Sequence, residues 1–127
     1  MTLDEYNGFC QSLPHTAHVV QWGDAHVWKV GGAKGKVFAI AGWNVKEGSG
    51  DFLAITFKVS PMAFDILPEQ PGLRPAPYLA SRGMKWIQHY ATPGLDAAAL
   101  KEYIAESHRL ASLSLTKKRQ KELGLNQ

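Results

Sequence analysis

The fold is decided by residues 18–43, HVVQWGDAHVWKVGGAKGKVFAIAGW. Short runs rich in β-branched and aromatic residues alternate here with turn residues, first Gly23-Asp24 and then the glycine-rich segment 31–35. This alternation is typical of β-strands joined by tight hairpins. With one further run beyond the quoted stretch, the sequence predicts an antiparallel meander of about four strands. The expected strands lie at residues 18–22, 26–30, 36–43 and 52–59.

Helices are expected before and after this meander. Thr2-Leu3-Asp4-Glu5 is a capping-box pattern that begins an amphipathic helix, and Ser60-Pro61 begins a second, shorter one. Segment 69–82 holds too many Pro and Gly residues for regular structure and is predicted to be a loop. Helices packed on an antiparallel sheet make an α+β single domain. The expected helices span residues 2–13, 61–68 and 96–114, and a further strand is expected near 84–90.

The net charge of +3 in 127 residues is confined to the C-terminus. Residues 1–115 carry ten Lys and Arg against ten Asp and Glu, whereas residues 116–127 carry four against one. We therefore expect a neutral domain over residues 1–115 and a basic helical extension or tail over 116–127. Leu123 and Leu125 indicate that this tail packs on a small apolar edge while its charges face water.

The single cysteine and the lack of long apolar runs indicate a soluble protein of the reducing cytoplasm. Cys10 has no partner for an internal disulfide, and residues 1–14 show no secretion signal. The longest purely apolar run, Val37–Ala41, is far shorter than the roughly 20 residues that cross a bilayer. Because Cys10 lies on the first helix beside apolar residues, we expect an inert, buried thiol rather than a nucleophile.

Residues 74–90, RPAPYLASRGMKWIQHY, place cations among aromatic rings with no acidic residue between Pro71 and Leu95. A polyanion is bound by such a mixture, because cations neutralise phosphates while rings stack on bases or pack beneath the cationic stems. The alternative is structural. Trp and Tyr on a short strand are first of all core residues, and Arg and Lys at loop ends are ordinary solvated groups.

Nearly the whole chain resembles the MmcQ/YjbR family. The similarity runs through QWGDAHVWKVGGAKGKVFA (21–39), ITFKVSP (55–61), RPAPYLASRGMKWIQ (74–88) and the closing helix with Ser107-His108, which leads to LTKKR (115–119). The resemblance implies a bacterial frataxin-like (CyaY-like) fold, in which helices flank a sheet. It also implies a double-wing arrangement that has been proposed to bind DNA.

The resemblance implies DNA binding, and the acid-free run from 72 to 94 predicts that this binding is weak, salt-sensitive and made through phosphates. No readout of base sequence is expected, because no helix shows basic and amide residues on an exposed face. The domain is expected to be a monomer or weak homo-oligomer. The turns at 31–35 and 46–50 are candidate wing tips. Alternation along the fourth strand places Lys58 towards solvent, opposite the apolar set from Leu53 to Val59. The matching positions are Lys58, Arg74, Pro75, Tyr78, Lys85 and Trp86, and Arg82 is added from local charge; all but Pro75 are the expected nucleic-acid-binding residues.

The main alternative is a small-ligand or protein-interaction module without catalytic activity. It is supported by Trp22 and Trp28, which are placed to line a small apolar cleft from neighbouring strands of a hairpin.

No enzyme, cofactor or metal site is expected, because the sequence brings together no acid, base and nucleophile. Segment 31–36 lacks the final Ser/Thr and the helix of a phosphate loop, and the first helix offers only Asp4 and Glu5 to a frataxin-like iron site. No closed zinc motif matches the spacing of His15, His18, Asp24 and His26.

Overall fold

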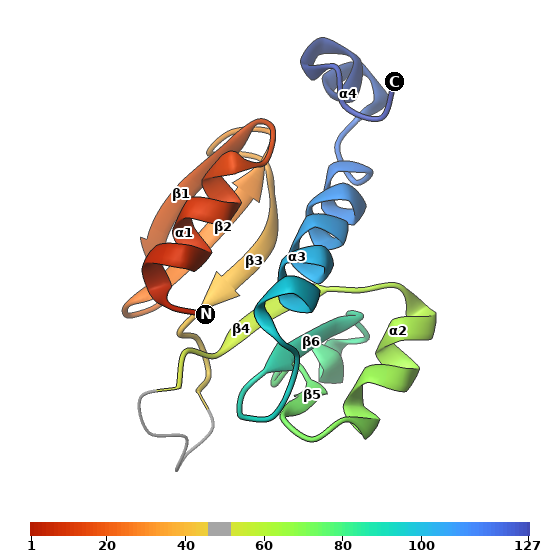
Figure 1. The fold of residues 1–127 in the computed structure, drawn as a ribbon. Helices are drawn as coiled ribbons and strands as arrows, with labels where there is room; N and C mark the ends of the chain where they lie inside the picture. The colour runs from red at the N-terminus through yellow and green to blue at the C-terminus, as the bar shows by residue number, and fades with distance from the viewer. Residues whose placement is uncertain (46–51) are drawn as a thin grey trace.

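The computed structural model describes residues 1–45 and 52–127 and shows a single α+β domain, as the sequence predicts (Figure 1). Within these residues one antiparallel sheet has six strands in the order β1-β2-β3-β4-β6-β5. The strands are β1 (Thr16–Gln21), β2 (Ala25–Val30), β3 (Lys36–Ala41), β4 (Ile55–Lys58), β5 (Leu73–Pro75) and β6 (Trp86–His89). The helices are α1 (Leu3–Ser12), α2 (Pro61–Ile66), α3 (Ala97–Ser112) and α4 (Lys117–Leu123), with 3-10 turns η1 (Leu67–Glu69) and η2 (Ala80–Arg82).

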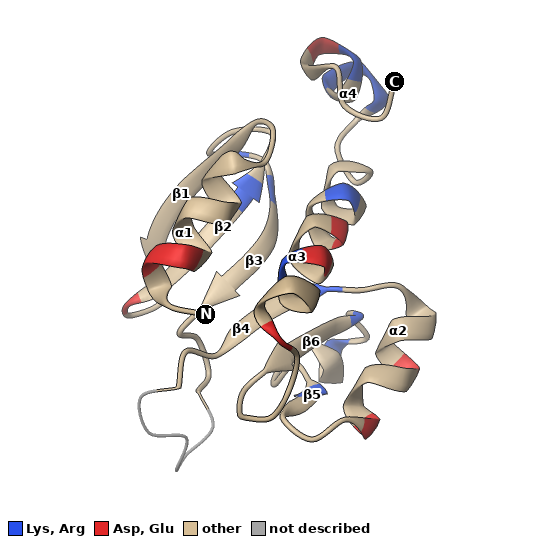
Figure 2. Cartoon of the chain, viewed as in Figure 1, with Lys and Arg blue, Asp and Glu red and all other residues tan. Residues whose placement is uncertain are grey.

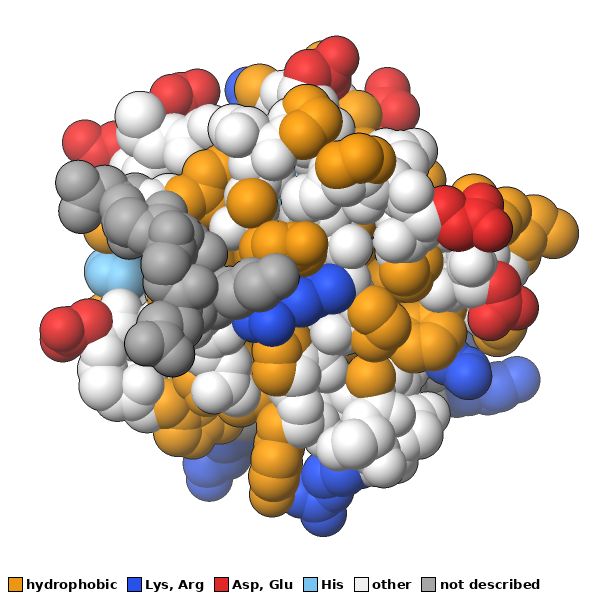
Figure 3. All heavy atoms as spheres, turned by 90° about the horizontal axis from the view of Figure 1, so that it is seen from below, with side chains coloured by type: hydrophobic (Ala, Val, Ile, Leu, Met, Phe, Trp, Pro, Cys, Tyr) orange, Lys and Arg blue, Asp and Glu red, His pale blue; other side chains and the backbone are white. Residues whose placement is uncertain are grey.

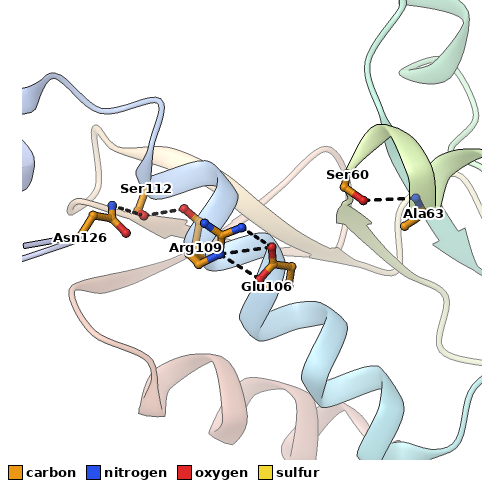
Figure 4. Close-up of polar contacts among 6 residues, drawn as sticks. All are labelled: Ser60, Ala63, Glu106, Arg109, Ser112 and Asn126. Atoms are coloured by element: carbon orange, nitrogen blue, oxygen red, sulfur yellow. Dashed lines mark hydrogen bonds and ion pairs between the residues drawn. The ribbon is translucent and has the colours of Figure 1, made fainter.

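The first two helices begin where their capping residues predict. The Thr2 hydroxyl accepts the backbone N–H of Glu5 at 3.1 Å, and the Glu5 carboxylate accepts the N–H of Thr2 at 3.3 Å. The Ser60 hydroxyl accepts the N–H of Ala63 at 3.2 Å (Figure 4), and Pro61 occupies the first turn of α2. These bonds satisfy N–H groups that have no partner inside the helix.

Strand β5 corrects the prediction of an irregular loop over residues 69–82. Pro75 argues against a strand at this position, because proline has no N–H to donate. In the structure β5 lies at the edge of the sheet and pairs only with β6, so a missing donor on its outer side costs nothing. The second half of the predicted loop contains η2.

The main core lies between the sheet and helices α1 and α3. Tyr6 and Cys10 from α1 and Leu100 and Ile104 from α3 are buried in one cluster with the inner side chains of the strands. A β-bulge at Phe38, which is skipped in the pairing with β2, places Phe38 and its neighbour Ala39 in this same cluster. The main core therefore lies on one face of the sheet, the face that α1 and α3 cover.

A second apolar cluster covers the opposite face, where the sequence predicts solvent. Ala76 and Trp86 pack there on Ala25, Val27 and Ile40. The apolar set of β4 is buried in the main core as expected. However, Thr56 on the other face is fully buried and Lys58 is half-buried, because the chain from Ala76 to Trp86 folds over this side.

Helix α4 packs against the C-terminal end of α3. Leu125 is 8% exposed in the main core, and the Gln120 amide donates to the backbone oxygen of Leu115 at 2.9 Å. The side chain of Asn126 also donates to the hydroxyl of Ser112 at 2.9 Å (Figure 4). The basic residues of α4, namely Lys117, Lys118, Arg119 and Lys121, are exposed, as the sequence indicates.

Among residues 1–45 and 52–127, no helix combines the length and the apolar character needed to cross a bilayer.

Candidate nucleic-acid interface

The segment Ala76–Trp86 is a closed loop whose two ends meet. The N–H of Ala76 donates to the backbone oxygen of Trp86 at 2.9 Å, continuing the β5–β6 pairing by one step. Gly83 ends η2 with φ +82°, a left-handed conformation that glycine adopts without steric cost. The loop buries Ala76 and Trp86 and directs Tyr78, Arg82 and Lys85 outward. This closed loop, which we call the platform, therefore presents the three exposed side chains to solvent.

Tyr78, Arg82 and Lys85, with the half-buried Lys58, form what we call the basic-aromatic face. The Arg82 Nη1 donates to the Tyr78 hydroxyl at 3.0 Å, and the Arg82 guanidinium carbon lies 5.3 Å from the centre of the Tyr78 ring. Lys58 and Lys85 line one groove of about 410 Å³ between the end of β4, the start of α2 and the platform. The predicted binding residues thus meet in two pairs, Tyr78 with Arg82 and Lys58 with Lys85, and each pair includes a residue of the platform.

Arg74 has a structural partner instead. Its Nε and Nη2 donate to the Gln88 side-chain oxygen at 2.8 and 2.6 Å, and Nη2 also donates to the backbone oxygen of Asn44 at 3.1 Å. Gln88 is fully buried and in turn donates to the backbone oxygen of Trp43 at 2.8 Å. The guanidinium therefore ties the chain after β3 to strand β6.

The remaining predicted residue, Trp86, is 5% exposed. Its ring belongs to the second apolar cluster beneath the platform. It supports the exposed residues from below and does not present a free ring face to a base.

An aromatic cleft of about 270 Å³ lies beside Tyr78, and Trp22, Trp43, Ile40 and Leu79 complete its walls. Trp22 is 54% exposed and its ring centre lies 5.8 Å from that of Trp43. Tyr78 is 60% exposed. The cleft lies on the same side of the sheet as the platform, because Ile40 belongs to the second cluster and Leu79 packs against it.

The prediction that Trp22 and Trp28 line the same cleft is wrong. Trp28 is buried on the opposite face, where its indole N–H donates to the Asn7 side chain at 2.9 Å and its ring stacks on His18 at 4.6 Å. Counting along β1 assigns Trp22 to that face too. However, β1 ends at Gln21, and Trp22 has φ +54°, which breaks the alternation of side chains.

The other candidate chemistries gain no support. His18 and His26 do meet, with ring nitrogens 2.9 Å apart, but no group of three His, Cys, Asp or Glu in the described part of the chain is arranged to hold a metal. Burial raises the pKa of the Cys10 thiol to about 12, so it stays protonated. Segment 31–35 is the turn between β2 and β3, with Gly31 at φ +93°, and the other candidate wing tip, 46–50, falls outside the described residues.

Few cations of the described part of the chain take part in ion pairs. In residues 1–45 and 52–127 there are two ion pairs, Arg109 with Glu106 on α3 (Figure 4) and Arg119 with Glu122 on α4. The cations of the basic-aromatic face pair with no carboxylate in this part of the chain.

Lys and Arg are densest on α4 (Figure 2). Seen from below, at the end that carries β5, the Lys and Arg side chains stand apart from one another among hydrophobic and other side chains, with acidic side chains towards the rim (Figure 3).

Comparison with known proteins gives one family and a set of similar folds. The model of the YjbR family matches residues 11–110. A crystal structure of a Deinococcus radiodurans protein with a DUF419 domain is 25% identical, with a TM-score of 0.80 over 98% of this chain and 88% of that one. A Pseudomonas syringae protein is 22% identical and shares the fold, with a TM-score of 0.69 over 87% of this chain and 99% of that one. No curated protein matches the chain at a significant level.

Proposed function

This chain belongs to the YjbR family, and from that premise we propose that it is a cytoplasmic, non-enzymatic DNA-binding domain that acts as a monomer or weak homo-oligomer. It contacts phosphates through the basic-aromatic face and does not read the base sequence. The observation that carries the proposal is that Arg82 and Lys85 extend from one closed loop beside Lys58, in a stretch of chain from 72 to 94 with no acidic residue, and that none of the three cations pairs with a described carboxylate. A phosphate can approach them without breaking an ion pair.

The contacts are few, so the affinity is modest and strongly dependent on salt. Arg74 is held by Gln88, which leaves Lys58, Arg82 and Lys85 as phosphate contacts. Each contact contributes about −0.9 to the slope of log affinity against log salt on a duplex, so three contacts predict a loss of about 40-fold between 50 and 200 mM salt. Phosphate contacts position a protein on DNA but carry no sequence information.

Fluorescence anisotropy with a labelled duplex at 50 and 200 mM salt tests this proposal. The double variant Arg82→Gln/Lys85→Gln is expected to lower the salt slope by about 1.8, since two contacts are removed. The matched control is Lys117→Gln/Lys118→Gln, which removes the same charge from the exposed face of α4. We expect the control to stay within twofold of the wild type, because the α4 cations only solvate that helix.

Point substitutions are preferred to truncation here, because deleting residues 116–127 would also remove the buried Leu125. No binding of the wild type at 50 mM, or an affinity independent of salt, would overturn the proposal. A larger loss of DNA affinity in the control than in the Arg82→Gln/Lys85→Gln variant would mean that the phosphate contacts lie on α4.

A further inference from the structure

We propose that the aromatic cleft receives one unpaired nucleobase, so that single-stranded DNA is bound more tightly than a duplex. This inference rests on the proposed function and extends it to the form of the nucleic acid. Its starting point is the convergence of three aromatic side chains, Trp22, Trp43 and Tyr78, on a single cleft. Exposed apolar side chains that lie singly are ordinary, but rings gathered around one hollow indicate a binding site.

Two of these rings are carried by residues whose backbone has an unfavourable conformation. Trp22 has φ +54° and Tyr78 has φ +70°, a left-handed conformation that bulky residues rarely adopt. Gly or Asn would occupy either position with less strain. Residues held in this way cluster at ligand sites, where the strain is part of the arrangement. The exposed rings are thus not explained by the stability of the turns that carry them.

The third wall is fixed by hydrogen bonds to the sheet. The Gln88 side chain donates to the backbone oxygen of Trp43 at 2.8 Å, and Arg74 holds the other end of the same amide at 2.6 Å. These bonds hold the backbone of Trp43 in place before any ligand arrives, and its ring lies beside that of Trp22, with ring centres 5.8 Å apart. A preorganised wall lowers the ordering cost of binding.

The size and chemistry of the cleft fit a nucleobase. Its volume of about 270 Å³ is slightly below the range of about 300 to 1,000 Å³ usual for pockets that hold a drug-sized molecule, which suits one flat ring system. Arg82, held on Tyr78, supplies a cation at the edge of the cleft for the adjoining phosphate. In a duplex the base faces are covered by their neighbours, so a base enters only after it has been unstacked and unpaired.

The test compares a labelled oligothymidine 12-mer with a duplex of the same length, using anisotropy and tryptophan fluorescence quenching. Trp22→Gly removes a ring while accepting the left-handed backbone, so the fold is retained. Base stacking on one aromatic side chain is worth about 5- to 140-fold in affinity, and we expect Trp22→Gly to lower single-strand affinity by a factor in that range. Trp22→Phe, which keeps an aromatic ring, is expected to retain most of the wild-type affinity for the single strand. Met62→Ala, at a residue 72% exposed on α2, is the control for loss of an exposed apolar side chain.

Each outcome separates this inference from the proposed function. Single-strand binding that is tighter than duplex binding, and weakened by Trp22→Gly but not by Met62→Ala, supports the inference. Equal affinity for both DNAs with no effect of Trp22→Gly overturns the inference and leaves the proposed function standing. Binding of neither DNA overturns both. Binding of free thymidine monophosphate as tightly as the 12-mer would make the ligand a nucleotide and overturn the assignment to a strand.

Discussion

Arg74 is expected to stabilise the fold and to make no contact with DNA. Arg74→Met removes two hydrogen bonds to the Gln88 oxygen, at 2.8 and 2.6 Å, and leaves that oxygen in a fully buried residue without its donor. Hydrogen bonds to charged groups contribute about 1.5 to 3 kcal/mol, and an unsatisfied buried acceptor costs about 1 to 3 kcal/mol. These effects overlap, and we expect the free energy of unfolding to fall by about 2 to 4 kcal/mol.

The expected change in melting temperature follows from the length of the chain. An unfolding entropy of about 2.1 cal/mol/K per residue over 127 residues gives about 0.27 kcal/mol per degree, so Arg74→Met should lower the melting temperature by about 7 to 15 °C. Thermal unfolding followed by circular dichroism measures this. The salt slope of DNA binding, measured below the melting transition, should stay unchanged.

A double-mutant cycle with Gln88→Met isolates the pair. Arg74→Met/Gln88→Met replaces both partners by apolar groups, which is far less costly than removing one of them. The double variant should therefore be more stable than the sum of the single changes predicts, by about 1 to 3 kcal/mol. An unchanged melting temperature in Arg74→Met, together with a salt slope reduced by about 0.9, would refute this reasoning and make Arg74 a phosphate contact.

Three further predictions concern stability. Trp86→Ala should lower it by about 3 to 5 kcal/mol, because a ring that is 5% exposed leaves a cavity; an unchanged thermal melt with lost DNA binding would contradict that role. Tyr78→Gly should leave stability unchanged or raise it by up to about 1 kcal/mol, since relief of the left-handed strain exceeds the entropy cost of glycine; a clear loss in urea unfolding would mean that the ring is needed for packing. Burial is the main cause that lowers the pKa of His89 and of His108, so below about pH 6.5 the unfolded chain binds more protons than the folded protein. The contribution of these two histidines to stability is thus complete above that pH and is lost as the pH falls. A urea midpoint that is higher at pH 5 than at pH 7.5 would contradict this assignment.

Much of the fold could be predicted because its signals are local. The capping box at Thr2, the N-cap at Ser60 and the glycine turn before β3 each act within a few residues, and each is found where the sequence places it. The buried Cys10 follows in the same way from the apolar side of α1.

The differences from the prediction come from strand pairing and from the backbone conformation at the end of a strand, and neither can be read from composition. Because Pro75 argues against a strand, the sequence does not predict β5, and it therefore does not indicate that Arg74 lies directly opposite Gln88. The positive φ of Trp22 likewise moved its ring to the other face of the sheet. The exposure of Tyr78, Arg82 and Lys85 follows from their residue types, whereas the hydrogen bonds of Arg74 required knowledge of the strand pairing.

The most direct test of the account uses the indole N–H signals of the four tryptophans in a ¹H–¹⁵N NMR titration with the oligothymidine 12-mer. Trp22 and Trp43 line the cleft, whereas Trp28 and Trp86 are buried. The account predicts that the Trp22 and Trp43 indole signals and the backbone signals of Tyr78 to Lys85 shift with the same affinity, while the Trp28 indole stays in place. Shifts confined to residues 117–121 of α4, with the Trp22 and Trp43 signals unmoved at saturation, would contradict it.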